Sequence, residues 1–182
     1  MYMGSLLALL SVIAALSSGR TDLDLPKLRA QLIKHEDKKA NVYKDSEGIP
    51  TIGVGFNLQR ADARKKIADL GLDYDKVLAG QQTLSEEQIG KLLDADIATA
   101  LGDCQAVFPK FTELSDVRQR VLVDMMFNLG KPRFVKFEKM IAAVKEGKFD
   151  KAADEMKDSK WYRQVKSRGK TLETMMRTDR DP

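Results

Sequence analysis

The sequence predicts an α+β protein that is mostly helical, and three observations support that class. From residue 25 onward, most segments carry apolar residues at helical spacing. One stretch, residues 42–56, instead mixes β-branched and aromatic residues with turn formers, which is typical of a small antiparallel sheet. The chain has 182 residues and is 43% hydrophobic and 32% charged, so we expect one domain with its own core and exclude a disordered or polytopic membrane chain.

The first predicted element is a helix that begins near Pro26 and runs to about Asp37. Proline is favoured in the first turn of a helix, and its fixed φ suits that position. Leu28, Leu32 and Ile33 then recur at helical spacing, which indicates one apolar face.

The sheet stretch, residues 42–56, follows this helix and is expected to turn near residues 46–48, where Ser, Glu and Gly follow one another. Gly53 and Gly55 are costly inside a strand unless the backbone bends or another segment passes close by. We therefore expect a bend or a close approach at these two glycines.

A long helix is predicted between the two halves of the chain. Ser85 and Gln88 have the spacing of a capping box, and Pro109 stops a helical run that ends near Phe108. At about 24 residues and about 36 Å, this helix is long for a small domain, so we expect it to connect two lobes. The other helices are expected at residues 61–70, 115–130, 134–146, 149–157, 161–164 and 167–177.

The predicted organisation has two parts. Residues 1–24 are a signal-anchor or signal-peptide segment, and residues 25–182 are the folded domain. Within that domain we expect a small lobe at residues 25–84, the connecting helix at 85–108 and a helical lobe at 109–182.

Residues 1–18 carry no charged side chain, and their apolar run is diluted by Ala and Ser. Three interpretations remain open: a weak membrane anchor, a cleavable signal peptide that ends near residues 15–17, and a buried soluble helix. No Lys or Arg precedes the apolar run, which weakens both export interpretations.

Charge and the rare residue types exclude several kinds of site. The lone cysteine, Cys104, excludes an intramolecular disulfide and is expected to be buried in the long helix. The lone histidine, His35, argues against a multi-histidine metal site, and we expect neither a metal nor a cofactor. The net charge of +4 suits an anionic wall or membrane surface, but no basic run with interleaved aromatics predicts nucleic-acid binding.

Glu36, Asp45 and Thr51 are the candidate catalytic residues. Glu36 ends the first predicted helix, and Asp45 and Thr51 lie in the hairpin that follows, so a hairpin that folds back brings all three to one cleft. Two carboxylates in unlike surroundings can divide acid and base duties, as glycoside hydrolysis requires. On spacing alone, solvated surface charges are the commoner explanation.

Three motifs stand in a fixed order along the chain. They are Glu36 with YKDSEG at residues 43–48 and TIGVG at 51–55, MMFNLG at 125–130, and SKWY at 159–162 with Arg168. Together they resemble the signature of the phage-type lysozymes, the endolysin family of tailed bacteriophages, which is similar to glycoside hydrolase family 24. The resemblance covers roughly residues 25–177 and implies a two-lobed lysozyme fold with a small β lobe and a helical C-terminal lobe.

In that family a Glu is the general acid, and an Asp and a Thr place the attacking water. The resemblance assigns these roles to Glu36, Asp45 and Thr51. It implies hydrolysis, with inversion, of the β-1,4 bond between N-acetylmuramic acid and N-acetylglucosamine in peptidoglycan. The resemblance also makes Arg168 the partner of the catalytic Glu, and we expect this ion pair to fix the rotamer of Glu36.

Several neighbouring residues have two interpretations each. Asn128 binds a sugar acetamido group or caps its own helix, and Glu47 contacts the substrate or only stabilises the turn. His35 adjoins the proposed acid, where a surface or packing role is commoner than that of a base. Trp161 and Phe127 are expected in the core rather than as platforms for sugar rings.

One position departs from the family pattern. Many relatives carry His after the Gly-x-Gly of the TIGVG motif, where this chain has Phe56. A His–carboxylate contact is therefore absent, and Asp96 is expected to lack that partner. This departure puts the stability of the small lobe in question, but not the catalytic trio.

The resemblance also suggests a role for residues 1–18. In some phage endolysins a weakly hydrophobic signal-anchor helix holds the enzyme at the host inner membrane and later releases it into the periplasm. A marginal bilayer helix can leave when the membrane potential collapses, and the Ala- and Ser-rich composition fits that behaviour. The segment has no Cys, so release is expected to depend on refolding or relief of restraint rather than on thiol exchange.

The sequence thus predicts a monomeric, phage-encoded muramidase that acts on bacterial peptidoglycan during host lysis. Two alternatives remain. One is a lytic transglycosylase, which needs no water-placing residue, so Asp45 argues against it. The other is a catalytically inactive wall-binding module, against which the intact trio of candidate residues argues.

Overall fold

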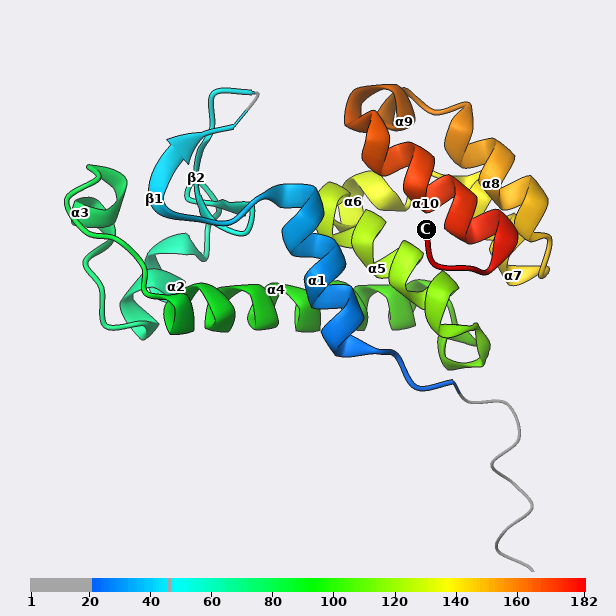
Figure 1. Cartoon of the computed structure of the whole chain (residues 1–182), viewed down its shortest axis with the longest axis horizontal. Coiled ribbons are helices and arrows are strands. Elements are labelled where there is room, and N and C mark those ends of the chain that lie inside the picture. The colour runs from blue at the N-terminus through cyan, green and yellow to red at the C-terminus, as the bar shows by residue number, and fades with distance from the viewer. Residues whose placement is uncertain (1–20, 46) are drawn as a thin grey trace, which may run out of the picture.

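The computed structural model describes residues 21–45 and 47–182, which form two lobes joined by a long helix (Figure 1). The described residues are mostly helical with one small antiparallel sheet, so the predicted α+β class is confirmed. The segment discussed above as an anchor, residues 1–18, lies outside the described residues. Among the helices of the described ranges, none combines the length and the apolar character needed to cross a bilayer.

The first helix, α1 (Leu25–Glu36), begins and ends close to the predicted bounds. The side chain of Asp24 accepts a 2.9 Å hydrogen bond from the backbone amide of Lys27, and Pro26 lies in the first turn. Asp37 has a positive φ of 63°, a left-handed conformation that a right-handed helix cannot continue. Glu36 is therefore the last helical residue, and the chain turns there into the sheet.

The sheet has the strand order β1-β2-β3, with β1 (Lys39–Lys44), β2 (Pro50–Gly53) and β3 (Phe56–Asn57) paired antiparallel. Gly53 and Gly55 have positive φ values of 65° and 69°, so the backbone bends between β2 and β3 as expected. The hairpin between β1 and β2 projects from the small lobe toward the helical lobe (Figure 1).

Two short helices complete the small lobe: α2 (Ala63–Asp69) and α3 (Tyr74–Leu78). Helix α3 was not expected from the sequence. The side chain of Asp73 caps it by accepting hydrogen bonds from the amides of Asp75 and Lys76, at 2.9 and 3.0 Å.

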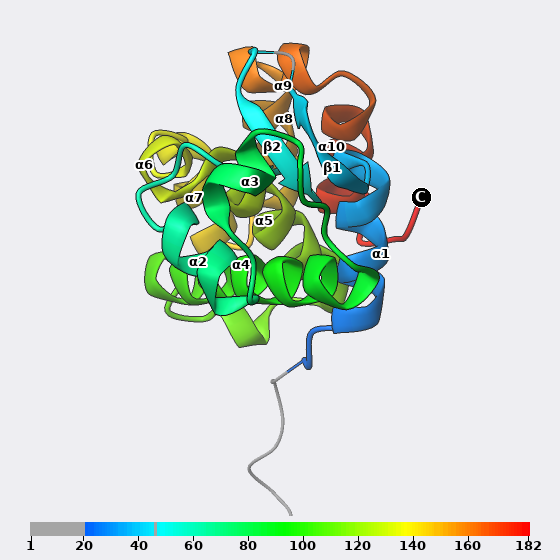
Figure 2. The same cartoon turned by 90° about the vertical axis from the view of Figure 1, so that its left-hand side faces the viewer.

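Helix α4 (Glu86–Val107) runs beneath both lobes, as Figures 1 and 2 show. The predicted capping box is present: Ser85 caps the amide of Gln88, and the Gln88 side chain accepts from the amide of Ser85. The helix ends one residue before Phe108, close to the predicted stop. Cys104 is fully buried on α4, as expected.

The helical lobe surrounds α5, whose residues 119–126 are all buried. A helix buried on every side must find partners for its polar side chains within the protein, which bears on the site below. The prediction of one helix over 134–146 was wrong, because the chain leaves helical geometry at Phe137, whose ring packs edge-on against Trp161 at 6.1 Å. The elements of this lobe are η1 (Phe111–Glu113), α5 (Asp116–Leu129), α6 (Lys131–Phe134), α7 (Glu138–Lys145), α8 (Phe149–Lys157), α9 (Lys160–Val165) and α10 (Ser167–Thr178).

The described chain starts at Thr21, beside the N-terminal end of α1 (Figure 1). The backbone amide of Thr21 donates to the carbonyl of Thr112 at 2.7 Å, and its carbonyl accepts from the side chain of Gln119 at 2.8 Å. Helix α1 has 12 residues and is therefore about 18 Å long. Glu36 lies at the other end of that length.

Candidate active site

Glu36 lies at the C-terminal end of α1, where the two lobes meet. Its side chain is 19% exposed, so it is neither fully solvated nor fully enclosed. Arg168 of α10 donates from Nη1 to its Oε1, and Asn128 of α5 donates from Nδ2 to the same oxygen at 3.2 Å. A Cβ added at Gly55 would lie 3.0 Å from Glu36 Oε2. The close approach of another segment that the sequence predicted at these glycines is therefore made by the side chain of Glu36. Three separate elements thus fix this carboxyl.

Arg168 is held from behind by Asp124, a fully buried carboxylate on α5. Its Nε donates to Asp124 Oδ1 at 2.8 Å, and its Nη2 donates to the backbone carbonyl of Asp124 at 3.3 Å. The expected contact between Arg168 and Glu36 is therefore present, but the guanidinium contacts two carboxylates rather than one.

His35 and Gln31 of α1 complete the surroundings of Asp124. Nδ1 of His35 lies 2.9 Å from Asp124 Oδ2, and Nε2 of Gln31 donates to the same oxygen at 2.7 Å. His35 has a side chain only 9% exposed, so it is a packing residue with a buried carboxylate partner and does not line the cleft.

Trp161 positions the amide of Asn128. The indole Nε1 donates to Asn128 Oδ1 at 2.9 Å, and the indole itself is nearly buried. The Asn128 side chain links Trp161 to Glu36 rather than capping its helix, and its contact with a sugar acetamido group stays a prediction. The expectation that Trp161 belongs to the core agrees with its burial, although it also lines the cleft.

Asp45 lies at the tip of the hairpin between β1 and β2. Its Oδ1 accepts hydrogen bonds from the amides of Glu47 and Ile49, at 2.8 and 2.9 Å. This pattern is an Asx-type turn, which fixes the carboxylate on the backbone of its own loop. Glu47 is exposed on the same loop.

Thr51 is placed differently from the two carboxylates. It is only 3% exposed on β2, and its hydroxyl donates to the carbonyl of Ile49 at 3.0 Å. Glu36 and Asp45 line the cleft, whereas Thr51 lies in the strand behind its wall.

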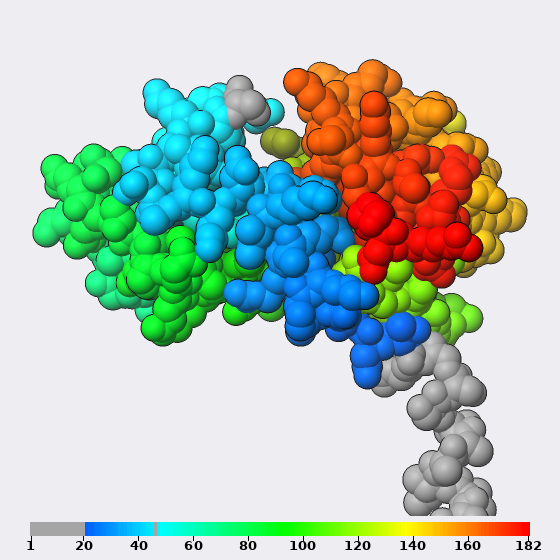
Figure 3. Space-filling model, in the orientation of Figure 1, coloured from blue at the N-terminus to red at the C-terminus, as the bar shows by residue number. Residues whose placement is uncertain are grey.

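The cleft between the lobes has a volume of about 780 Å³ and is open to solvent. The surface is hollowed between the small lobe and α9, as Figure 3 shows. Both lobes and α4 contribute side chains, and charged and apolar groups alternate along the walls. Those from the small lobe and α4 include Glu36, Asp45, Glu47, Arg60, Asp96 and Asp103, and those from the helical lobe include Phe127, Asn128, Arg133 and Trp161.

Ionisable groups in and behind the cleft are shifted by one another. Burial raises the pKa of the Tyr43 hydroxyl, and the negative charges of Glu36, Asp37 and Asp45 raise it further, so Tyr43 stays neutral. Burial alone would raise the pKa of the Asp124 carboxyl, but the adjacent Arg168 and the His35 contact lower it below its usual value. Asp124 is therefore an ionised carboxylate in the core.

Asp96 lacks a histidine partner, as expected from Phe56, but its carboxylate is paired with two cations. Its carboxylate accepts from Arg60 Nη1 at 2.8 Å and from Lys66 Nζ at 2.7 Å. The ring of Phe56 lies beneath both cations, 4.8 Å from the Arg60 guanidinium carbon and 5.8 Å from Lys66 Nζ. Two cations over an aromatic face thus take the place of the absent histidine contact.

Sequence reasoning missed Asp124, although it is the most buried acidic side chain of the site. Its position on α5, next to the MMFNLG motif, was the one available signal. A charged residue in the middle of a fully buried helical run requires a partner, and that requirement points to an ion pair.

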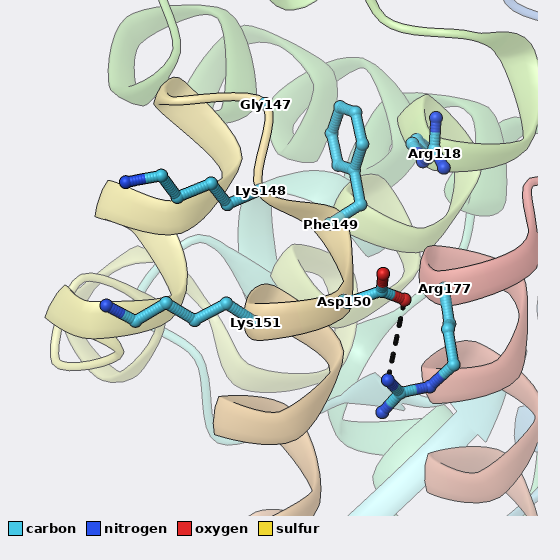
Figure 4. Close-up of a pocket in the computed structure, with 7 residues that line it drawn as sticks. All are labelled: Arg118, Gly147, Lys148, Phe149, Asp150, Lys151 and Arg177. Atoms are coloured by element: carbon cyan, nitrogen blue, oxygen red, sulfur yellow. Dashed lines mark hydrogen bonds and ion pairs between the residues drawn. The ribbon is translucent and has the colours of Figure 1, made fainter.

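A second hollow, of about 410 Å³, lies on the helical lobe between α5, α8 and α10 (Figure 4). Three of its basic side chains have partners: Arg177 contacts Asp150, Arg118 stacks on the ring of Phe149 at 3.6 Å, and Lys148 contacts the carboxylate of Glu146 at 2.7 Å. We assign this hollow no ligand.

Comparison with known proteins gives consistent results. Residues 33–180 match the phage lysozyme family. Probable T4-type lysozyme 1 of Dictyostelium discoideum is 25% identical over 151 residues, which cover 79% of this chain and 89% of that protein.

Two phage proteins are similar over part of their length. The pre-baseplate central spike protein Gp5 of Enterobacteria phage T4 is 28% identical over 81% of this chain, and peptidoglycan hydrolase gp36 of Enterobacteria phage SP6 is 30% identical over 66%. The matched regions are 27% and 12% of those two proteins, so this chain corresponds to a fraction of each. Because the family match spans most of the chain and the whole of the cleft, this chain belongs to the phage lysozyme family.

Proposed function

We propose that this chain is a muramidase that hydrolyses peptidoglycan between N-acetylmuramic acid and N-acetylglucosamine during lysis of a phage host. The observation that carries the proposal is the setting of Glu36, a partly exposed carboxyl that Arg168 and Asn128 fix on the wall of an open cleft. The family match, and relatives that are named lysozyme and peptidoglycan hydrolase, support the substrate class.

In the proposed reaction, Glu36 donates its proton to the glycosidic oxygen, and the bond from that oxygen to C1 breaks. Asp45, whose carboxylate is oriented by two loop amides, takes a proton from the water that attacks C1. Thr51 is proposed to help place that water from behind the cleft wall, because its hydroxyl donates to the carbonyl of Ile49, the residue whose amide donates to Asp45 Oδ1. Glu47 and Asn128 line the cleft and are proposed to contact the glycan.

The test is release of soluble fragments from purified peptidoglycan by the full chain and by E36Q. This change is nearly isosteric and removes the proton that catalysis needs. We expect E36Q to lose activity about 10²-fold or more while keeping its circular dichroism and melting temperature. E138Q, which changes an exposed glutamate at the start of α7, is the matched control and should keep full activity. Undiminished activity of E36Q would overturn the proposal.

The products separate the proposed hydrolase from its alternatives. Hydrolysis gives reducing N-acetylmuramic acid ends, whereas a lytic transglycosylase leaves anhydro ends, and mass spectrometry distinguishes them by one water. D45N should lower the rate without producing anhydro ends. A folded full chain that binds the wall but releases no fragment would instead favour an inactive wall-binding module.

We also propose that residues 1–18 hold the enzyme at the host inner membrane, facing the periplasm, until it is released. The uncharged Ala- and Ser-rich composition supports this. Cys104 supports release without thiol exchange, because burial raises its pKa well above the usual value and keeps it a thiol.

Fractionation of cells that express the full chain tests the tether. We expect the protein in the membrane fraction, with transfer to the soluble fraction after the membrane potential is collapsed. L9R, which places a charge in the apolar run, should lower the membrane-bound share, because a central charge makes insertion unfavourable. Sedimentation of the released enzyme should give a monomer. Equal fractionation of L9R and the unchanged chain would contradict the tether.

A further inference from the structure

Asp124 lies directly behind the proposed proton donor, with Arg168 between them. Its carboxylate is fully buried and makes three contacts, with Arg168 Nε at 2.8 Å, Gln31 Nε2 at 2.7 Å and His35 Nδ1 at 2.9 Å. Both carboxylate oxygens therefore have partners. A buried charge with this many partners is held in one place.

Arg168 poses an electrostatic problem for a general acid. A guanidinium in contact with Glu36 favours the ionised carboxylate, whereas a proton donor must carry its proton when the substrate binds. The second carboxylate on the same guanidinium reduces this effect, because its negative charge offsets the positive charge that Glu36 experiences.

Arg168 also owes its position to Asp124. Its side chain is 6% exposed, and Nε and Nη2 are both directed at Asp124, one to the carboxylate and one to the backbone carbonyl. This leaves Nη1 to meet Glu36. The planar guanidinium fixes the direction of all three donors together, so the anchor at Asp124 determines where Nη1 lies.

We propose that Asp124 is a positioning residue for Glu36: it anchors Arg168 against the proposed proton donor and offsets the arginine charge there. The proposal rests on the proposed role of Glu36 as general acid. Asp124 lies behind Arg168, is fully buried and does not line the cleft, so it acts on Glu36 through the side chains that it contacts, and of these Arg168 is the one that reaches the Glu36 carboxyl.

The other groups around this pair are accounted for. Within the described residues, Glu36 is faced by Arg168 from α10, by the neutral amide of Asn128 from α5 and by neutral Tyr43 from β1. Asp124 is faced by Arg168 and by His35 and Gln31 of α1. Arg120 pairs with Asp116 and Asp181 and touches this group only through Gln31, at 3.0 Å.

The test compares the pH–rate profile of the full chain with that of D124N. This change keeps the shape of the side chain and removes its charge. The arginine charge then has one carboxylate fewer to offset it, so we expect the alkaline limb of kcat to move down by about one pH unit. Loss of the anchor should also lower kcat about 10- to 100-fold at the optimum, with KM for solubilised glycan nearly unchanged.

D179N is the matched control. Asp179 contacts Arg118 in the same lobe at 3.2 Å, but it lies outside the cleft and contacts neither Arg168 nor Glu36. D179N should keep the pH–rate profile of the unchanged chain, even if its melting temperature falls. If Asp124 had only a structural role, D124N would behave in the same way: it would lose stability and keep the pH–rate profile.

R168K keeps the inference testable if D124N does not fold. A lysine has one nitrogen and cannot hold Asp124 and Glu36 in the arrangement of the fork, so kcat should fall by a similar factor. A folded D124N with unchanged kcat and profile, or R168K with unchanged kcat, would overturn the inference. E36Q separates the two proposals: if E36Q is active the proposed function fails, and if it is inactive while D124N is unaffected only this inference fails.

Discussion

The indole Nε1 of Trp161 donates a 2.9 Å hydrogen bond to Oδ1 of Asn128. Indole nitrogen can only donate, so the oxygen of the Asn128 amide must face Trp161 and the nitrogen must face Glu36. The direction of the second bond, from Asn128 Nδ2 to Glu36 Oε1, therefore follows from the first. A nearly buried aromatic side chain sets the polarity of a contact to the proposed acid.

W161F should lower activity by releasing this constraint. Phe keeps most of the apolar contacts, including the edge-on contact with Phe137, but has no donor for Asn128. The amide is then free to turn its oxygen toward Glu36, and we expect kcat to fall about tenfold, which corresponds to the loss of one hydrogen bond. Y162F, the next residue on α9, packs against Gly169 and should change kcat little. Equal kcat in both variants would contradict the argument.

G55A should lower activity by more than backbone strain explains, because the added Cβ would press on Glu36. The φ of Gly55 is 69°, and an added Cβ would lie 3.0 Å from Glu36 Oε2. G71A is the control, since Gly71 has a φ of 76° and open space around the added Cβ. Both should lose about 1 kcal/mol of stability in urea unfolding, and only G55A should lose wall hydrolysis. Equal activity would mean that Glu36 moves aside without consequence.

D96N should destabilise the small lobe. The Asp96 side chain is 11% exposed and bridges Arg60 and Lys66, so its neutralisation leaves the more exposed Asp62 as the one carboxylate that pairs with these two cations in the described residues. We expect a loss of about 1–3 kcal/mol in the free energy of unfolding. D69N removes an exposed pair in the same lobe, with Lys65 at 2.6 Å, and should cost less than about 0.5 kcal/mol. Urea unfolding of both variants checks the difference.

Stability should depend on Asp124 in one pH range. The pKa of Asp124 is below its usual value in the folded chain and returns to about 3.9 on unfolding. Ionised Asp124 therefore stabilises the fold above about pH 4, and that stabilisation is lost as the pH falls through the folded-state pKa. At pH 6 D124N should be about 3 kcal/mol less stable than the unchanged chain, and the gap should shrink toward pH 2.5. A constant gap in urea unfolding would contradict this.

Most of the fold could be predicted because its signals are local. Ser85 and Gln88 lie within one turn, so the capping box was readable and is present. Helix α3 was missed because five residues are too few to show a helical period. The break at Phe137 was also missed, because it depends on packing against Trp161, a contact between residues far apart in the sequence.

In the site, too, residues within local motifs could be predicted, whereas residues held by distant contacts could not. Glu36 and Arg168 were found through motifs, and the structure brings them into contact. Asp124 has no such local pattern, because its partners lie 89 residues away at His35 and 44 residues away at Arg168. For Asp96, the family pattern predicted that a histidine partner is absent but gave no sign that Arg60 and Lys66 contact the carboxylate instead.

Helix α1 separates the start of the described chain from the chemistry by its whole length. Thr21 is fixed by hydrogen bonds to the backbone of Thr112 and the side chain of Gln119 near one end of α1, and Glu36 ends this helix of about 18 Å at the other. This end of α1 is therefore a suitable attachment site. A surface, a bead or a second protein coupled ahead of Thr21 should leave the cleft between the lobes free to bind a long glycan strand. The enzyme can thus be immobilised from this end without blocking the cleft.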